Sequence, residues 1–258
     1  MRLSVLNKFS SKNFYIDPFP HILIENCIDE NIYRELEDSL DIARIKKLGM
    51  MRAVYPEHRY KLSEFKDNNY AVNYLWREFM DYHCSSEFVN KALNIFSTYV
   101  KDIDFRQYDK ENIYTRSNVP DSLSRKDFRK TLVSDCQIVI HDPLDESMTT
   151  RTVHVDSPKE IYAGLLYMKR GNDGSAGGDL ELYANSGDRT SYIKDSHREV
   201  ELGSVVKSKV VGYKRNSFVM FLNSAASVHG VSPRVGAETE RVSVNIIAER
   251  LKSKFFIP

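Results

Sequence analysis

The residues best suited to chemistry are two histidines and one aspartate. His154-Val-Asp156 sets an imidazole and a carboxylate two positions apart, and in extended backbone both side chains point to the same side. His229 follows much later, a separation that in a sheet fold can bring a third ligand from a different strand. Two histidines and one carboxylate form the facial triad that holds non-haem Fe(II) and leaves coordination positions open. The spacing therefore predicts a metal site at His154, Asp156 and His229.

A second His-x-acid sequence shows that the doublet alone is a weak signal. His197-Arg-Glu199 has the same form, but it lies in a charged stretch shortly before His229, so we interpret His197 as a surface residue. The competing interpretation of the first doublet is structural: His154 pairs with a neighbouring acid, and His229 caps a turn beside Gly230. The residues that follow His229 favour the metal site.

An arginine and a serine after His229 predict a site for an anion. In Arg241-Val-Ser-Val-Asn-Ile-Ile-Ala, a strand puts Arg241, Ser243 and Asn245 on one face and the apolar residues on the other. A guanidinium that faces a barrel interior needs an anion, because burying an unpaired charge is costly. Its fork holds a carboxylate through two hydrogen bonds, and the Ser243 hydroxyl can add a third. A dicarboxylic cosubstrate that chelates the metal and meets Arg241 satisfies both sites.

Helices are expected in the first part of the chain. Ten of the eleven glycines lie between Gly164 and Gly236, and the Gly-poor part before them shows apolar residues at four-residue intervals. The pattern predicts helices over 30–40 behind a cap at Asp29, over 70–82, and from Ser86 to about 100. Residues 21–24 are typical of a strand, and residues 101–133 are polar and irregular, with a possible role as a lid or substrate contact.

Strands are expected from residue 135 onward, where the period changes to two. Short alternating or apolar runs occur at 135–141, 160–168, 179–183, 217–222 and 241–248, with no room between them for crossover helices. Gly177-Gly178 is interpreted as a tight turn into the Asp179 strand. The pattern predicts an α+β protein with a mainly β core, an antiparallel sandwich or jelly roll with N-terminal helices packed against it. We expect one domain over 1–258, with 1–133 as mostly helical support and 134–250 as the catalytic core.

Composition excludes several classes of partner. Lys plus Arg is 37 and Asp plus Glu is 36, so a formal charge of +1 provides no field for nucleic acid. The N-terminus reaches Lys8 before an apolar stretch can build a secretory signal, and no run is long enough to cross a membrane. Three widely spaced cysteines indicate neither a disulfide framework nor a thiolate zinc site. We expect a cytoplasmic protein that binds neither nucleic acid nor membrane.

The order and spacing of these motifs resemble the Fe(II)/2-oxoglutarate-dependent dioxygenases, in their prolyl 4-hydroxylase-like branch. The motifs that carry the resemblance are Pro18-Phe19-Pro20-His21, His154-x-Asp156, Leu165-Leu166-Tyr167-Met168, Gly177-Gly178-Asp179-Leu180, His229 and Arg241-x-Ser243. The resemblance spans about half of the chain and implies a double-stranded β-helix of the jelly-roll or cupin-like kind.

The resemblance also implies cofactors and residue roles. His154, Asp156 and His229 become Fe(II) ligands, and Arg241 becomes the partner of the 2-oxoglutarate C5 carboxylate. Tyr167 stands where the family often has a cosubstrate-binding tyrosine. The family couples 2-oxoglutarate and O2 to hydroxylation of an unactivated C–H bond, with succinate and CO2 released. Its halogenating members lack the carboxylate, so Asp156 favours hydroxylation.

One position departs from the family pattern. His141 falls near where relatives often place a further cosubstrate-binding tyrosine, which leaves that contact open.

Two alternatives and the substrate stay open at this point. A cupin-type metalloprotein has no need of Arg241 and Ser243, and a silent binding module has no need of intact ligands. The resemblance implies a prolyl, amino-acid or other small-molecule or peptide substrate without choosing among them. We expect the segments 101–133 and 142–152 to border the mouth, with Arg151 selecting an anionic substrate group. The oligomeric state is not readable from the sequence.

Overall fold

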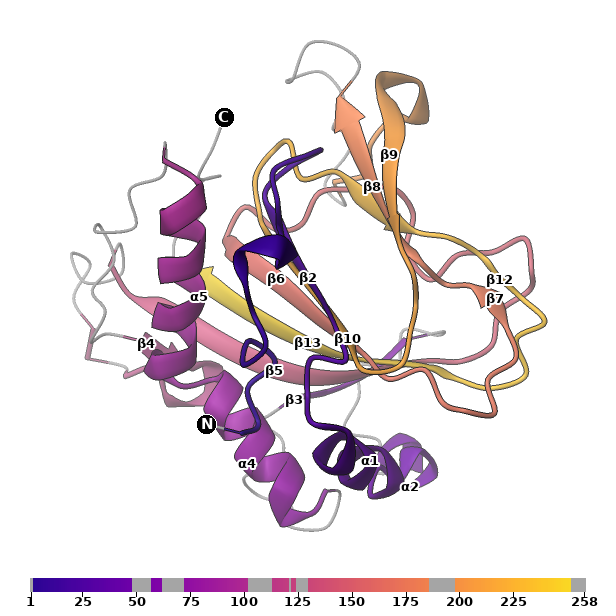
Figure 1. Ribbon diagram of the computed structural model, residues 1–258, viewed down its shortest axis with the longest axis horizontal. Coiled ribbons are helices and arrows are strands. Elements are labelled where there is room, and N and C mark those ends of the chain that lie inside the picture. Colours follow the sequence, from indigo (N-terminus) through magenta and orange to yellow (C-terminus); the bar gives the residue numbers. More distant parts are fainter. Residues whose placement is uncertain are drawn as a thin grey trace.

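A computed structural model describes residues 2–47, 57–61, 72–101, 113–120, 122–123, 130–185 and 198–251. Within these residues, eight strands form a main sheet in the order β1-β2-β10-β6-β13-β5-β3 (Figure 1), and β4 pairs in parallel with β5. The other neighbours in this sheet are antiparallel. The strands are β1 Phe14–Tyr15, β2 His21–Glu25, β3 Glu57–Lys61, β4 Ile113–Thr115, β5 Leu132–His141, β6 Glu160–Tyr167, β10 Ser217–Leu222 and β13 Arg241–Arg250.

A smaller sheet faces the main one. It has the order β11-β8-β9, and a short ribbon pairs β12 with β7 at one end. These strands are β7 Ala176–Gly177, β8 Leu180–Asn185, β9 Val205–Val211, β11 His229–Val231 and β12 Arg234–Val235. In Figure 1, β8 and β9 lie away from helices α4 and α5, on the other side of the main sheet. The two facing sheets, antiparallel except for the β4–β5 pair, make the jelly roll that the sequence pattern predicts and the double-stranded β-helix that the family resemblance implies.

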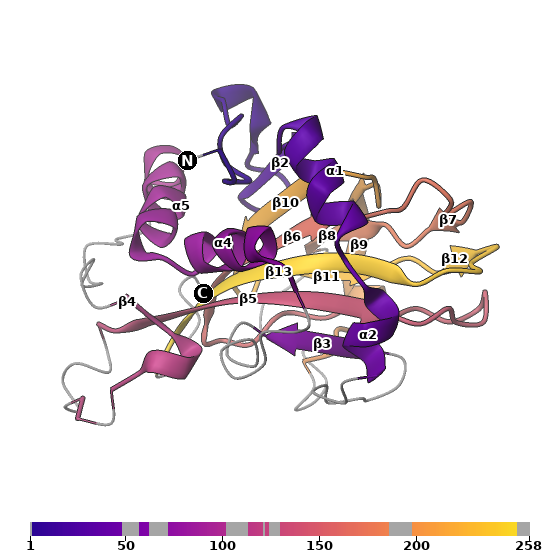
Figure 2. The ribbon, with the colours of Figure 1, turned by 90° about the horizontal axis from the view of Figure 1, so that it is seen from below.

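Helices cover the opposite face of the main sheet (Figure 2). They are α1 Glu30–Asp38, α2 Ile42–Lys47, α4 Tyr74–His83 and α5 Ser86–Tyr99, with short 3-10 turns at Ser11–Asn13, Arg116–Asn118 and Leu202–Ser204. Each long helix begins at a side-chain cap: Asp29, Asn73 and Ser85 accept hydrogen bonds from backbone N–H groups of the first turn. The predicted helices are therefore confirmed, although the second begins at Tyr74 rather than near residue 70. None of the described helices is long and apolar enough to span a bilayer.

Alternation along β13 divides the interior into two compartments. Val242, Val244 and Ile246 pack with the helices in the larger core, whereas Ser243 and Ile247 face the smaller sheet. Because successive side chains of a strand point to opposite faces, one sequence period supplies both the packing against helices and the lining of a cavity.

The first half of the chain contributes more strand than its helical pattern suggests. β2 and β3 are both built into the main sheet, so the core takes strands from outside residues 134–250. Glu57–Lys61 reads Glu-His-Arg-Tyr-Lys, which carries no apolar alternation because β3 is an edge strand with mostly half-buried polar side chains.

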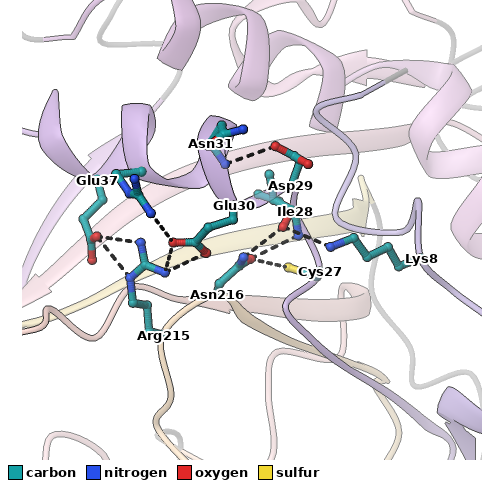
Figure 3. Close-up of polar contacts among 10 residues, drawn as sticks. Lys8, Cys27, Ile28, Asp29, Glu30, Asn31, Glu37, Arg215 and Asn216 are labelled. Atoms are coloured by element: carbon teal, nitrogen blue, oxygen red, sulfur yellow. Dashed lines mark hydrogen bonds and ion pairs between the residues drawn. The ribbon is translucent and has the colours of Figure 1, made fainter.

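A polar network fastens helix α1 to the turn before β10 (Figure 3). Arg215 donates to Glu30 and Glu37, and its guanidinium lies 4.3 Å from the centre of the Tyr33 ring. Asn216 is buried with a φ of 53°, accepts a hydrogen bond from Ile28 N and donates one to Ile28 O. The buried Asn216 bonds fix this junction more firmly than the exposed ion pairs, because solvent screens exposed charges.

Candidate metal centre

The three predicted ligands converge on one point. His154 and His229 exchange two backbone hydrogen bonds of 2.8 and 2.9 Å, so a β-bridge aligns them although they are distant in sequence. Their ring centres are 4.3 Å apart. The Asp156 carboxylate lies 3.4 Å from Nε2 of His154 and 3.5 Å from Nε2 of His229. One ligand atom from each residue lies within 4.8 Å of the others, which is close enough to hold a single ion.

Hydrogen bonds orient both imidazoles toward that point. Nδ1 of His154 contacts the Thr152 carbonyl oxygen at 2.8 Å, and Nδ1 of His229 contacts the Ser227 carbonyl oxygen at 2.8 Å. A carbonyl only accepts, so each Nδ1 carries the proton and donates it. Each Nε2 therefore presents its lone pair to the centre, and a backbone acceptor behind the ring is the usual support for a metal-bound histidine.

The electrostatics keep the three groups in the forms that bind metal. Burial lowers the pKa of His229 to about 4 against the opposing effect of Asp156, so the ring is neutral at pH 7. Burial raises the pKa of Asp156, but His229 and His154 outweigh it and hold the pKa of that carboxyl well below its usual range. Metal binding requires neutral imidazole and ionised carboxylate. Two nitrogens and one carboxylate suit Fe(II) in a non-haem site, so the donor set fits the metal that the sequence predicts.

Arg241 is buried with an unmatched charge. It is 3% exposed, its Nε donates to the Gly178 carbonyl oxygen at 3.0 Å, and its guanidinium lies 4.8 Å from the Tyr213 ring centre and 5.2 Å from that of Tyr167. No carboxylate of the described residues lies within ion-pair distance of it. Aromatic faces and one carbonyl compensate a buried guanidinium only in part. The surroundings therefore fit an incoming carboxylate, and Ser243 lines the same cavity.

Tyr167 lies beneath this guanidinium rather than in the cavity wall. It is fully buried, and its hydroxyl proton has no acceptor among the described residues. Burial raises the pKa of Tyr167 to about 12, so the hydroxyl stays protonated and can donate. Tyr167 therefore supports the Arg241 guanidinium, and the expected contact of its hydroxyl with the cosubstrate stays a prediction.

His141 reaches the cavity but is engaged by a residue that the sequence did not single out. It pairs with Arg241 across β5 and β13, and its Nε2 lies 3.2 Å from Oε2 of Glu57 on β3. Its Nδ1 has no partner in the described part of the chain. Burial lowers the pKa of His141, although the hydrogen bond to Glu57 raises it in part. The neutral ring can therefore form hydrogen bonds in the cavity.

The predicted site residues, with the exception of Tyr167, line one cavity of about 430 Å³. Its wall also contains charged residues that the sequence analysis missed: Glu57, Arg59, Glu160 and Arg198. Thr150 and Arg151, from the segment 142–152 that is predicted to border the mouth, also line this cavity. His197 and most of 101–133 lie outside the described residues, so the surface and lid assignments stay predictions.

The Gly177-Gly178 segment sets the position of the Arg241 partner. Gly177 has a φ of 81°, and a Cβ built on it would lie 2.0 Å from the Pro233 carbonyl oxygen. Gly178 has a φ of 71° and supplies the carbonyl that Arg241 binds. In place of the predicted tight turn, Gly177 ends β7 and Gly178 lies in the short link to β8, which begins at Leu180. Only glycine fits at Gly177 because both the space and the backbone angle exclude a side chain.

We therefore expect Gly177→Ala to lower the free energy of unfolding by about 2 kcal/mol or more, since positive φ and a backbone clash add. Urea unfolding monitored by circular dichroism measures the change. Gly174→Ala is the matched control, because nothing lies within 4 Å of a Cβ there and its φ is not positive. A loss of unfolding free energy in Gly177→Ala no larger than that in Gly174→Ala would show that position 177 tolerates a side chain.

Comparisons with known proteins agree with this geometry. Residues 143–248 match the family model described as the 2OG-Fe(II) oxygenase superfamily. No curated protein matches the chain.

Solved structures provide the second comparison. The chain is similar to a prolyl 4-hydroxylase from Phytophthora capsici at 14% identity, with 96% of this chain and 63% of that one covered and a TM-score of 0.48. It is similar to a prolyl 4-hydroxylase from Pseudomonas putida at 14% identity, with 89% of this chain and 92% of that one covered and a TM-score of 0.47. It is also similar to a protein described as an oxygenase from Shewanella oneidensis at 14% identity, with 89% of this chain and 81% of that one covered and a TM-score of 0.50. The chain thus spans less than two thirds of the Phytophthora protein. At 14% identity, the last likeness shows the fold alone.

Proposed function

We propose, from the premise that residues 143–248 belong to the 2OG-Fe(II) oxygenase superfamily, that this protein is an Fe(II)- and 2-oxoglutarate-dependent dioxygenase that hydroxylates an unactivated C–H bond. The observation that carries the proposal is the convergence of His154, Asp156 and His229 in the same cavity as the uncompensated Arg241. When bound, Fe(II) supplies the redox chemistry by which substrate, 2-oxoglutarate and O2 become hydroxylated substrate, succinate and CO2.

The chain's own contribution is to hold, orient and exclude water. His154, Asp156 and His229 hold the metal from one side, each imidazole kept in place by its backbone acceptor. Arg241 and Ser243 hold the C5 carboxylate of 2-oxoglutarate, and the Tyr167 ring supports the Arg241 guanidinium from beneath. The unpartnered Nδ1 of His141 is a further candidate contact for the cosubstrate.

Burial gives these contacts their strength. Arg241 is 3% exposed and Tyr167 fully buried, so both act at low local dielectric, where a charge-assisted hydrogen bond is stronger than in water. Phe221 packs on His229 with ring centres 4.6 Å apart and closes one side of the metal position to solvent. A dry, preorganised site is what such a reaction needs from its protein.

The substrate and the setting belong to the same proposal. We propose a small-molecule or peptide substrate of the prolyl or amino-acid kind, with residues 134–250 as the catalytic core of a single domain and 1–133 as support. The three cysteines are free and buried, which is consistent with the cytoplasmic location that we retain as a prediction.

The test uses anaerobic protein with Fe(II) and 2-oxoglutarate. We expect a weak visible charge-transfer band that neither component produces alone, followed by succinate on admission of O2. Protein loaded with Zn(II) is the control, since it retains the ligands without the redox chemistry. Stoichiometric iron binding without the band would reject chelation by 2-oxoglutarate, and a band without succinate would leave a silent binding module.

A further inference from the structure

The cavity wall contains charged side chains that the metal and the cosubstrate do not use, and two of them form no ion pair among the described residues. Glu160 begins β6, and Arg198 lies beside the metal-binding segment; both line the cavity. Unpaired charges in a concave site indicate a ligand that satisfies them, because leaving them desolvated is costly.

A bulge turns Glu160 toward the metal side of the sheet. Tyr162 pairs with Ala248 and Glu160 pairs with Glu249, so Ile161 is the extra residue on β6. Without the bulge, Glu160 would share the face of Tyr162, which packs among the helices. With the bulge, it joins Ala163 and Leu165 in the cavity wall. Bulges next to active sites commonly re-aim a side chain in this way.

Arg198 is clamped to the segment that carries two metal ligands. Its Nε donates to the Val155 carbonyl oxygen at 3.1 Å, and its own carbonyl accepts from Val155 N at 3.1 Å. Its φ of 63° is in the left-handed region, where a non-glycine residue is strained. Strain of this kind persists where surrounding structure holds it and clusters at binding sites. The clamp leaves the Nη atoms of Arg198 without a hydrogen bond in the part of the chain described.

Glu160 and Arg198 line the same cavity but form no ion pair with each other. Burial and the charges of Asp156 and Glu249 raise the pKa of the Glu160 carboxyl well above its usual range, and the charges of Arg198 and Arg59 counteract this in part. Neither the Arg198 nor the Arg59 guanidinium, however, lies within 4.0 Å of the Glu160 carboxylate. Arg59 is already held by Glu57 and Gln137. The open pair is therefore Glu160 and Arg198.

We propose that Glu160 and Arg198 form a substrate subsite for a small zwitterion, in which Glu160 binds an ammonium group and Arg198 binds a carboxylate. This inference rests on the proposed function, and it identifies the substrate of the proposed dioxygenase as a free amino acid. A bound ammonium stabilises the ionised form of Glu160, so with Arg198 the pair matches a zwitterion better than a peptide amide, which offers only partial charges. A cavity of about 430 Å³ lies at the small end of ligand pockets and also holds the cosubstrate.

The probes are free L-amino acids with uncharged side chains, each compared with its N-acetyl and its carboxamide derivative. We measure the KM of each probe from stimulated succinate release, and its Kd by ligand-observed NMR with metal-free protein. We expect the free form to be preferred over either derivative by about 30-fold or more, as for loss of one buried charged partner.

Variants assign each end of the zwitterion. Glu160→Gln is expected to remove the preference for the free amine over the N-acetyl form, while the preference for the carboxylate persists. Arg198→Gln is expected to do the reverse. Glu238→Gln and Arg44→Gln make the same chemical changes on exposed side chains and should keep both preferences. Because each readout is a ratio within one variant, a general loss of folding does not imitate it.

The outcomes separate the two proposals. Succinate formation that no free amino acid stimulates, or neutral doubly blocked derivatives that bind as tightly as free amino acids, would overturn the zwitterion site and leave the oxygenase standing. A variant that weakens all three forms equally would assign Glu160 or Arg198 a structural role and also overturn it. Absence of both the charge-transfer band and succinate would remove the oxygenase and this inference with it.

Discussion

Replacing His229 with alanine is expected to lower 2-oxoglutarate-dependent succinate formation by more than about 100-fold, because loss of even an outer partner of a metal ligand costs about 10–100-fold. The variant removes one of the three donors that the described part of the chain brings within 4.8 Å of one another. It also leaves Asp156 without one of the two imidazoles that hold its pKa down. Iron affinity measured by equilibrium dialysis and turnover measured at saturating 2-oxoglutarate should fall together. His154→Ala is expected to behave alike.

The sequence itself offers a matched control. His197-Arg-Glu199 repeats the His-x-acid form, but Glu199 accepts a hydrogen bond of 2.8 Å from the Thr152 hydroxyl and is not part of the donor cluster. His197→Ala should therefore keep both iron affinity and turnover. Unchanged iron affinity in His229→Ala, or an equal loss in His197→Ala, would contradict the assignment of the metal centre.

The convergence of the three candidate ligands could be predicted in part from the sequence, because the geometry of the doublet follows from strand periodicity. His154 and Asp156 share a side of extended backbone, and the alternation after Arg241 correctly separated the cavity face of β13 from its packed face. What periodicity does not specify is the partner strand. The bridge between His154 and His229 depends on long-range pairing, which the family resemblance supplied and residue spacing alone did not.

The charged wall of the cavity could not be predicted for two physical reasons. Glu57 and Arg59 lie on an edge strand without apolar alternation, so no local pattern identifies β3 as part of the sheet. Glu160 faces the cavity only because of the bulge at Ile161, and a one-residue shift of register inverts the face that periodicity assigns. Both features depend on pairing in three dimensions.

Replacing Arg241 with glutamine is expected to raise the KM for 2-oxoglutarate by about 30-fold or more, since truncating one partner of a buried charge pair costs about 2–5 kcal/mol. The same change should not destabilise the protein without cosubstrate, because it removes a buried charge that no carboxylate of the described residues balances. With 2-oxoglutarate at about 100 times its wild-type Kd, wild type should gain about 2.7 kcal/mol of stability. The variant should gain far less. Urea unfolding with and without 2-oxoglutarate measures both effects.

Arg234 provides the contrast that makes this prediction specific. Arg234 is also buried, and its guanidinium carbon lies 5.8 Å from the centre of the Tyr213 ring. Unlike Arg241, it has a carboxylate partner, because its Nη2 donates to Asp173 at 2.9 Å. Arg234→Gln leaves that carboxylate buried without its partner and should destabilise the protein without cosubstrate by about 3–5 kcal/mol. The two arginines thus differ in what the fold already provides, a carboxylate for Arg234 and none for Arg241. If Arg241→Gln destabilised the unliganded protein as much as Arg234→Gln and left the response to 2-oxoglutarate intact, Arg241 would be a packing residue and the cosubstrate carboxylate would bind elsewhere.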